Sequence, residues 1–283
     1  MIQFLSGLFV LIWATGFIVA GIVAPRADPL TFLTARHALS IVVFVGLSLA
    51  VKAAWPRGAK AWRDALVTGM LLHAVYIGGV FWAVSQGLGA GLTGLVTALS
   101  PLLTAALAIP LLHERLVARQ WAGIAIGVVG VGLILAPKMD GADAVPMHAL
   151  LVALGATLSL SLGTIWQKYS KPAMDLRVNA AIQFIGALLL TAPVAYFTEA
   201  HRFDASPALW GALAWAVLVL SVGGISILLV LLKRGAASKV APLLYLAPPT
   251  AAIIALLLFG EALTAIQVIG MVLAVVGAFA ARK

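Results

Sequence analysis

The chain has 283 residues, of which 63% are hydrophobic and only 10% are charged, and its mean hydropathy is +1.13. A soluble domain carries about a quarter charged residues and under half apolar ones, so this composition excludes a water-soluble globular protein. The net charge of +9 would suggest a nucleic-acid partner in a soluble protein, but the basic cytoplasmic loops of a membrane protein account for it, and no nucleic acid is expected.

Apolar runs of about 20 residues, the length that crosses a bilayer, follow one another along the chain without the alternation of β-barrel strands. The first 25 residues hold no charged side chain, so we expect a retained first span rather than a cleaved signal. A long uncharged stretch, 65–113, is divided by the glycine-rich segment 85–91. The sequence therefore predicts an all-α polytopic membrane protein with ten transmembrane helices, near 2–24, 30–51, 64–84, 88–112, 119–136, 147–167, 177–198, 207–232, 236–259 and 263–281.

Basic residues concentrate in the loops that would face one side of the membrane. With the N-terminus inside, fourteen of the eighteen Lys and Arg residues fall in the loops after the even-numbered spans and in the C-terminal tail. The opposite side receives only Arg26, Lys138 and Arg202, while Arg36 lies within the second span. Because cytoplasmic loops collect Lys and Arg, we expect both termini in the cytoplasm.

A constant shift of 147 residues superposes the two halves of the chain. It carries three non-aliphatic residues onto identical ones, Pro101 onto Pro248, Glu114 onto Glu261 and Gln120 onto Gln267. We therefore predict a first repeat at 1–140 and a second at 141–283, each with five spans. Since five is odd, the second repeat would cross the membrane upside down. Inverted repeats are a signature of secondary transporters, which bind substrate near the midplane between the halves.

Four stretches carry a family resemblance, namely Trp13–Phe17, Pro29–Arg36, Ala90–Leu116 and Ala236–Glu261. They resemble the EamA pattern of the drug/metabolite transporter superfamily, and the segment from proline to glutamate, which occurs twice, is the most specific part. The resemblance implies ten helices in two EamA repeats around a central cavity in a bacterial inner membrane. It also implies export of amino acids or other metabolites, and the chain looks most like the YddG-type aromatic amino-acid exporters.

Polar side chains within spans are costly and are therefore functional candidates. Arg36 is the one buried cation expected, and its planar fork would either clamp a substrate carboxylate or bind helix-end carbonyls and hydroxyls. His73 and Tyr76 are three residues apart on one helix face, where they would contact cargo or form part of the core. Thr97 and Ser100 belong to a hydroxyl stripe on the fourth span, which either lets helices pack closely or forms a polar cavity wall.

Prolines and glutamates mark equivalent places in the two repeats. Pro101 and Pro248 interrupt the backbone hydrogen bonding of the fourth and ninth spans, and such breaks are tolerated at depth only inside protein or against a water-filled cavity. Both are predicted to act as hinges. Glu114 and Glu261 would lie at opposite membrane faces, each capping or pairing at a helix end in a structural or gating role. No acidic residue is expected at the midplane, which argues against a carboxylate proton relay.

Aromatic and amide side chains within spans complete the candidate site. Trp13, Trp166 and Tyr245 lie inside spans rather than at interfaces, and Gln183 is a polar neighbour in the seventh span. Such rings commonly pack against lipid or core, but a ring-shaped cargo would gain about 0.5–1.5 kcal/mol from each aromatic contact. The hypothesis is that Trp166 and Tyr245 hold the cargo ring while Gln183 and the His–Tyr pair bind its polar end.

Two other classes of protein remain open from the sequence, an intramembrane enzyme and a channel. His113 and Glu114 begin like a zinc-protease helix, but Val117 stands where the second histidine is required. There is also no cysteine nucleophile, so no enzymatic activity, metal or cofactor is expected. A channel would lack saturation and counterflow, and nucleotide sugars, drugs or polyamines are alternative cargoes of the same fold. The expected partners are a small-molecule substrate and the lipid bilayer.

Overall fold

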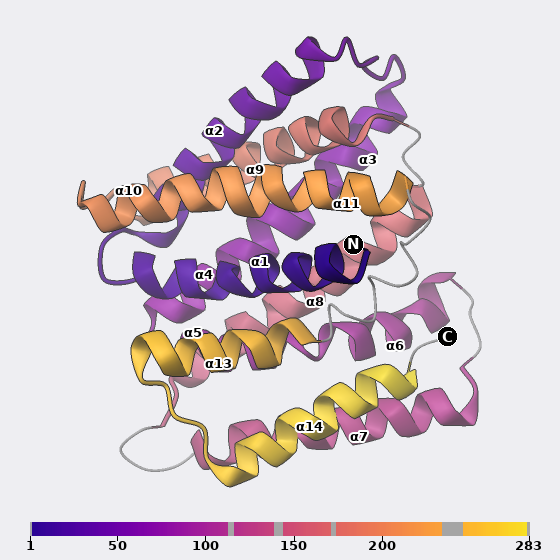
Figure 1. Ribbon diagram of the computed structural model, residues 1–283, viewed down its shortest axis with the longest axis vertical. Coiled ribbons are helices and arrows are strands. Elements are labelled where there is room, and N and C mark those ends of the chain that lie inside the picture. Colours follow the sequence, from indigo (N-terminus) through magenta and orange to yellow (C-terminus); the bar gives the residue numbers. More distant parts are fainter. Residues whose placement is uncertain (1, 113–115, 139–143, 171–173, 234–245, 282–283) are drawn as a thin grey trace.

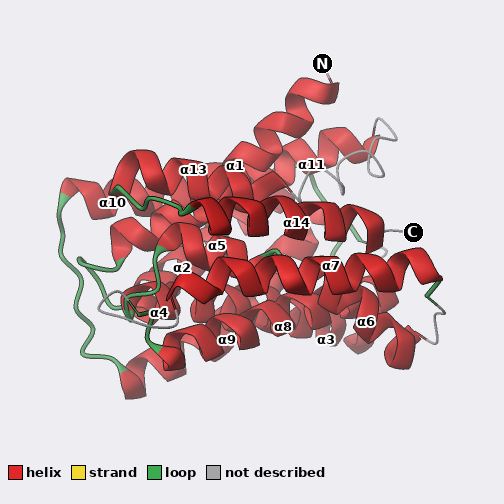
Figure 2. Ribbon diagram, turned by 90° about the horizontal axis from the view of Figure 1, so that it is seen from below, coloured by secondary structure: helices red, strands yellow, loops and turns green. Residues whose placement is uncertain are grey.

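The computed structural model describes residues 2–112, 116–138, 144–170, 174–233 and 246–281, and its regular elements there are all helices (Figure 1; Figure 2). The all-α class predicted from the sequence is confirmed over these residues. The first half contains α1 (Ile2–Val23), α2 (Pro29–Ala50), α3 (Ala59–Gly69), η1 (Met70–Tyr76), α4 (Ile77–Ser85), α5 (Ala90–Thr97), α6 (Ser100–Leu112), α7 (Ala118–Leu135) and η2 (Ala136–Lys138). The second half contains α8 (Met147–Ser170), α9 (Leu176–Thr198), α10 (Pro207–Ala214), η3 (Trp215–Gly223), α11 (Gly224–Lys233), α13 (Ala247–Phe259) and α14 (Ala265–Ala281).

Eight helical segments in the described ranges are long and apolar enough to cross a bilayer. They are Phe4–Val23, Pro29–Ala50, Ala59–Ser85, Ala90–Leu111, Ala118–Leu135, Met147–Ser170, Leu176–Thr198 and Pro207–Ile227. The apolar helices α13 and α14 hold 13 and 17 residues, less than the roughly 20 of a full span. The chain is thus a multi-pass membrane protein, but the predicted count of ten spans is not reached by helix length, and the predicted span 236–259 is described only from residue 246.

Three of the spans are not regular α-helices. The third span contains the π-helical segment η1 between α3 and α4, and the span that begins at α10 contains the π-helical segment η3. The fourth span is broken at residues 98 and 99, between α5 and α6. Pro101, the second residue of α6, has no N–H to continue the hydrogen bonds of α5, which explains why the break falls there.

Helices α7 and α14, which lie side by side in both views (Figure 1; Figure 2), pack antiparallel. Gln120 of α7 donates its side-chain N–H to the carbonyl of Ala281 at 3.2 Å, and Gln267 of α14 donates to the carbonyl of Ile134 at 3.0 Å. The shift of 147 residues converts the first of these contacts into the second. The first contact joins the start of α7 to the end of α14, and the equivalent contact joins the start of α14 to the end of α7.

Helices α2 and α9 form a second antiparallel pair. At one end the Glu199 carboxylate, just after α9, accepts the backbone N–H groups of Leu30 and Thr31 at 2.8 and 2.7 Å. This caps the N-terminus of α2, where an anion is favourable. Further along, the rings of Phe44 and Phe184 stack with centroids 5.7 Å apart. The pair is therefore fixed by a charged cap at one end and by aromatic packing along its length.

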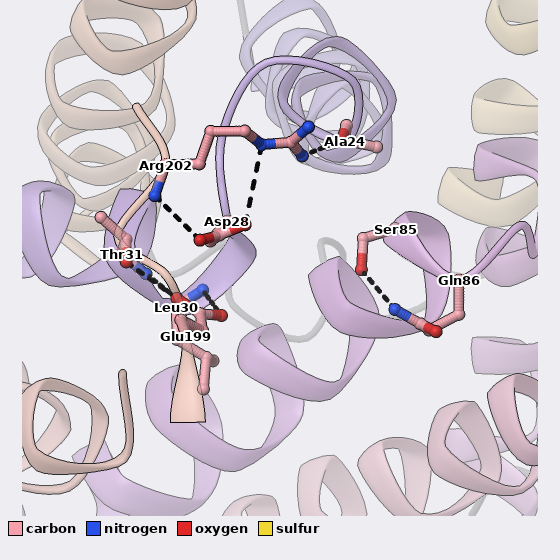
Figure 3. Close-up of polar contacts among 8 residues, drawn as sticks. All are labelled: Ala24, Asp28, Leu30, Thr31, Ser85, Gln86, Glu199 and Arg202. Atoms are coloured by element: carbon pink, nitrogen blue, oxygen red, sulfur yellow. Dashed lines mark hydrogen bonds and ion pairs between the residues drawn. The ribbon is translucent and has the colours of Figure 1, made fainter. Parts of the chain in front are cut away.

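The loop after α1 and the loop after α9 are tied together at this end of the bundle (Figure 3). The Asp28 carboxylate accepts the backbone N–H of Arg202 at 2.9 Å, and its other oxygen lies 3.7 Å from the Arg202 Nε. Ala27 and Phe203 add an antiparallel backbone bridge. These contacts link the two halves of the chain outside the helices, so this end is closed between α2 and α9.

Candidate functional site

A cavity of about 150 Å³ lies between helices of both halves. Its walls come from α1, α2, η1 and α4 in the first half and from α9, η3 and α11 in the second half. The lining residues are Phe9, Ile12, Trp13, Gly16, Phe17, Arg36, His73, Tyr76, Ile77, Val80, Phe81, Phe184, Leu220, Ser221, Gly224 and Ile225. A site shared by two halves opens or closes when the halves move relative to each other, so its location suits a transported molecule.

The two π-helical segments occupy equivalent positions and both border the cavity. The shift of 147 residues carries η1, Met70–Tyr76, onto 217–223, and η3 spans Trp215–Gly223. π-helical turns are rare and occur frequently at functional sites. Here they carry His73 and Tyr76 on one side and Leu220 and Ser221 on the other. The irregular backbone thus faces the space between the halves.

Arg36 supplies the positive charge in the cavity wall and is only 6% exposed. Its Nη2 lies 3.4 Å from the hydroxyl of Ser221, which itself donates to the carbonyl of Ala216 at 3.0 Å. The Nε of Arg36 is buried and has no hydrogen-bond partner among the described residues. The ion pairs recorded for the described residues join other arginines, so the guanidinium retains donor capacity for a ligand.

His73, which also lines the cavity, is held by an amide and an aromatic ring. Its Nε2 lies 3.3 Å from the Oε1 of Gln183, and its ring stacks on Phe184 with centroids 4.6 Å apart. Gln183 and Arg36 are equivalent under the shift of 147 residues. The contact from α9 to η1 through Gln183 therefore corresponds to the contact from α2 to η3 through Arg36. One half presents an amide where the other presents a cation.

The structure brings four of the predicted substrate-binding residues into the cavity wall, namely Trp13, Arg36, His73 and Tyr76. Gln183 lies behind His73 and contacts it directly.

Trp166 is placed elsewhere. It does not line the cavity, and its indole N–H donates to the carbonyl of Asp64 at 3.2 Å. Thr97 and Ser100 are also outside the lining set. The Thr97 hydroxyl bonds the carbonyl of Gly94, and Ser161 donates to the carbonyl of Ser100. These hydroxyls satisfy backbone groups and join helices. Tyr245 lies outside the described residues.

The predicted hinge and gating residues that the structure describes lie at or next to helix ends. Pro101 begins α6, and Pro248 lies in the first turn of α13, so neither interrupts the middle of a described helix. Glu261 accepts the N–H groups of Ala90 and Gly91, both at 2.8 Å, and so caps α5. Glu114 lies outside the described residues.

Four aromatic lining residues were not among the sequence candidates, namely Phe9, Phe17, Phe81 and Phe184. Phe9 and Phe17 share a helix face with Trp13, because residues four apart on a helix are neighbours. That spacing was the available signal. Phe81 and Phe184 carry no such signal, because only the packing of α4 and α9 brings them to the cavity.

A polytopic helical bundle with a small cavity between its two halves has the architecture of a membrane transporter. The sequence pattern of the EamA-like transporter family matches the chain twice, over residues 2–136 and 147–282, and the chain belongs to this family. It is accordingly a membrane transporter of the EamA type.

Similar proteins agree with this family. A "Probable amino-acid metabolite efflux pump" of Salmonella typhimurium is 28% identical, with 98% of this chain and 93% of that protein aligned. A protein of the same description from Escherichia coli is 27% identical, with 97% and 92% aligned. A solved crystal structure that is 21% identical matches 99% of this chain and 96% of its own, with a TM-score of 0.66, and shows the same fold.

Proposed function

We propose that this transporter exports amino acids or related small metabolites, preferably aromatic ones, by alternating access through the cavity between its repeats. The observation that carries the proposal is the cavity wall, in which six aromatic residues surround one arginine. Rings in the wall favour a ring-shaped cargo through stacked or edge-to-face contacts, and the guanidinium fork favours a carboxylate. The two similar efflux pumps support the cargo class through their descriptions.

The size of the cavity favours a small cargo. Its volume is about 150 Å³. Pockets for drug-sized ligands measure roughly 300–1,000 Å³. A nucleotide sugar would need a much larger space, so the conformation described favours a compact metabolite.

The same proposal includes two inverted five-helix repeats, with α13 and α14 as the last two of ten spans and both termini in the cytoplasm of a bacterial cell. The antiparallel pairing of equivalent helices, α2 with α9 and α7 with α14, supports a two-fold axis perpendicular to the helices. Repeats related in this way can exchange conformations, so that the open side alternates. The contacts of Asp28 with Arg202 and of Glu199 with α2 would then close the outer side.

Counterflow in proteoliposomes tests the proposal. Vesicles preloaded with unlabelled phenylalanine should transiently accumulate labelled phenylalanine, tyrosine and tryptophan, and should accumulate labelled alanine less. Flux without counterflow would identify a channel. Absence of counterflow with every amino acid of the panel would overturn the amino-acid assignment, and equal counterflow with all would overturn the aromatic preference.

A further inference from the structure

Among the described residues that line it, the cavity offers one positive charge and no negative one. We infer that it binds cargo with an aromatic ring and a carboxylate but no free ammonium group, such as an N-acylated or deaminated aromatic amino acid, more tightly than the free aromatic amino acids that it also transports. This inference rests on the proposed function and ranks aromatic monoanions above free aromatic amino acids within its substrate class.

Arg36 provides the site for the carboxylate. The side chain is 94% buried, lines the cavity, and keeps its Nε without a partner among the described residues. Its one recorded hydrogen bond, to the hydroxyl of Ser221, is long at 3.4 Å. A buried guanidinium without a counter-ion is costly, and a bidentate carboxylate is the ligand that its planar fork matches. Bound cargo would therefore supply the missing anion.

An ammonium group would find no such partner. None of the described lining residues is acidic. The hydroxyl of Ser221 is already engaged with Arg36 and with the carbonyl of Ala216. Pro101 and Pro248 also lie outside the residues that line the cavity. A zwitterion would have to bury its ammonium next to a cation and against apolar walls, whereas a monoanion avoids that penalty.

His73 offers an acceptor for one neutral N–H group. Because the Oε1 of Gln183 can only accept, the Nε2 of His73 donates to it, and the Nδ1 of the neutral imidazole is left as an acceptor. This Nδ1 is buried and has no partner in the described part of the chain. An amide N–H of an N-acylated amino acid would satisfy it with a single bond. The three charged N–H groups of an ammonium would not be satisfied.

Three compounds with the same ring separate the charge states. At pH 6, N-acetylphenylalanine is a monoanion, phenylalanine a zwitterion and phenylalanine amide a cation. Titration calorimetry of each compound into the purified protein in detergent measures binding without requiring transport. We expect N-acetylphenylalanine to bind at least about tenfold more tightly than phenylalanine, and phenylalanine amide to bind most weakly.

Variants of Arg36 test whether its charge causes the preference for N-acetylphenylalanine. In Arg36→Gln the advantage of N-acetylphenylalanine should fall below about threefold, while Arg36→Lys, which keeps the charge without the fork, should retain part of it. Arg57→Gln removes the same charge from an exposed position outside the cavity and should keep the full preference.

The wild-type titrations alone decide the inference, whether or not the variants fold. Equal binding of the three compounds, or tighter binding of phenylalanine or its amide, would overturn it. So would a failure of N-acetylphenylalanine to bind. In each of these cases the proposed function would still hold if free aromatic amino acids showed counterflow. Absence of counterflow with every amino acid would overturn the proposed function, whatever the titrations show.

Discussion

Two pairs of equivalent helices meet across the two halves, and they are built differently. The pair α7 and α14 meets through glycines, and its buried amides, Gln120 and Gln267, donate hydrogen bonds across the interface in a matched way. The pair α2 and α9 meets through aromatic rings and carries unpaired polar atoms. In the described part of these two helices the buried side chains with an unpaired nitrogen or oxygen are Thr34, Arg36, His37, Ser40, Asn179 and Thr191.

This difference distinguishes α7 and α14, which hold the fold together, from α2 and α9, which border the cavity. Leaving a buried polar group unsatisfied costs about 1–3 kcal/mol, so a pair with several such groups is retained for something other than stability. In the symmetric pair the buried amides are hydrogen-bonded, and a glutamine makes the equivalent bond in each half. The other pair places Arg36 and Gln183 at equivalent positions, next to the cavity. Under the proposed function, asymmetry marks the helices that would bind cargo.

The largest effect is expected at the glycine contacts of α7 and α14. A Cβ at Gly130 would lie 2.5 Å from the backbone N of Ala274, whereas a Cβ at Gly132 would meet nothing within 4 Å. Gly130→Ala should therefore lower stability by more than about 2 kcal/mol, because backbone would have to move. Gly132→Ala should be neutral or stabilising by up to about 1 kcal/mol through helix propensity. Thermal unfolding of the detergent-solubilised variants measures both, and equal melting temperatures would contradict the close packing.

A smaller and symmetric effect is expected from the crossed amides. Gln120→Leu and Gln267→Leu each remove one interhelical hydrogen bond and the cap that the same amide oxygen gives to the backbone N–H of Val117 or Thr264, at a cost of at least about 1 kcal/mol. Since the two bonds are equivalent, the two variants should unfold at similar temperatures. A loss confined to one of them would show that the pair is not symmetric in energy.

The scaffold could be predicted well from the sequence, for a physical reason. Eight of the predicted segments coincide with helices long and apolar enough to cross a bilayer, because apolar length and charge are local properties. The shift that matches Gln120 to Gln267 anticipated the residues that later proved to bond across the interface, because repeated architecture preserves the residues that hold it together.

The site could be predicted only in part. Arg36 and His73 stood out because polar groups within spans are rare. Trp13 and Trp166 looked alike in sequence, yet the first lines the cavity and the second bonds the backbone of Asp64. Which face of a helix lines the cavity depends on the helices packed around it. In a span that is apolar on all sides, the sequence does not indicate which face that is. The π-helical segments likewise left no recognisable pattern.

The two tryptophans sharpen the distinction between site and scaffold. Trp13→Ala should weaken binding of aromatic cargo several-fold, in line with about 0.5–1.5 kcal/mol per ring contact, and should leave small aliphatic cargo little changed. Trp166→Ala should not change the preference among cargoes. Competition binding with a panel of aromatic and aliphatic compounds measures this preference in both variants. A loss of aromatic preference in Trp166→Ala but not in Trp13→Ala would assign the ring-binding role to Trp166.

The smallest effects are expected at the prolines. Pro101→Ala restores an N–H that could bond the carbonyl of Thr97 and bridge the break between α5 and α6, which should bias one conformation. Pro248→Ala changes only the first turn of α13, where proline is well tolerated. Both variants should slow turnover more than they weaken binding, Pro101→Ala by more. Unchanged turnover in both would remove the hinge role.

Protection of an introduced thiol tests the central claim, that cargo occupies the cavity between the halves. The chain has no cysteine, so one substitution gives one thiol. Gly16 lines the cavity with open space at its Cβ, and Gly58 is an exposed glycine outside it with equal room. Alkylation of Gly16→Cys by a small maleimide should slow several-fold when aromatic cargo is added, and alkylation of Gly58→Cys should not change. Equal rates with and without cargo at Gly16→Cys, for a cargo that the variant still transports, would contradict the assignment of this cavity as the binding site.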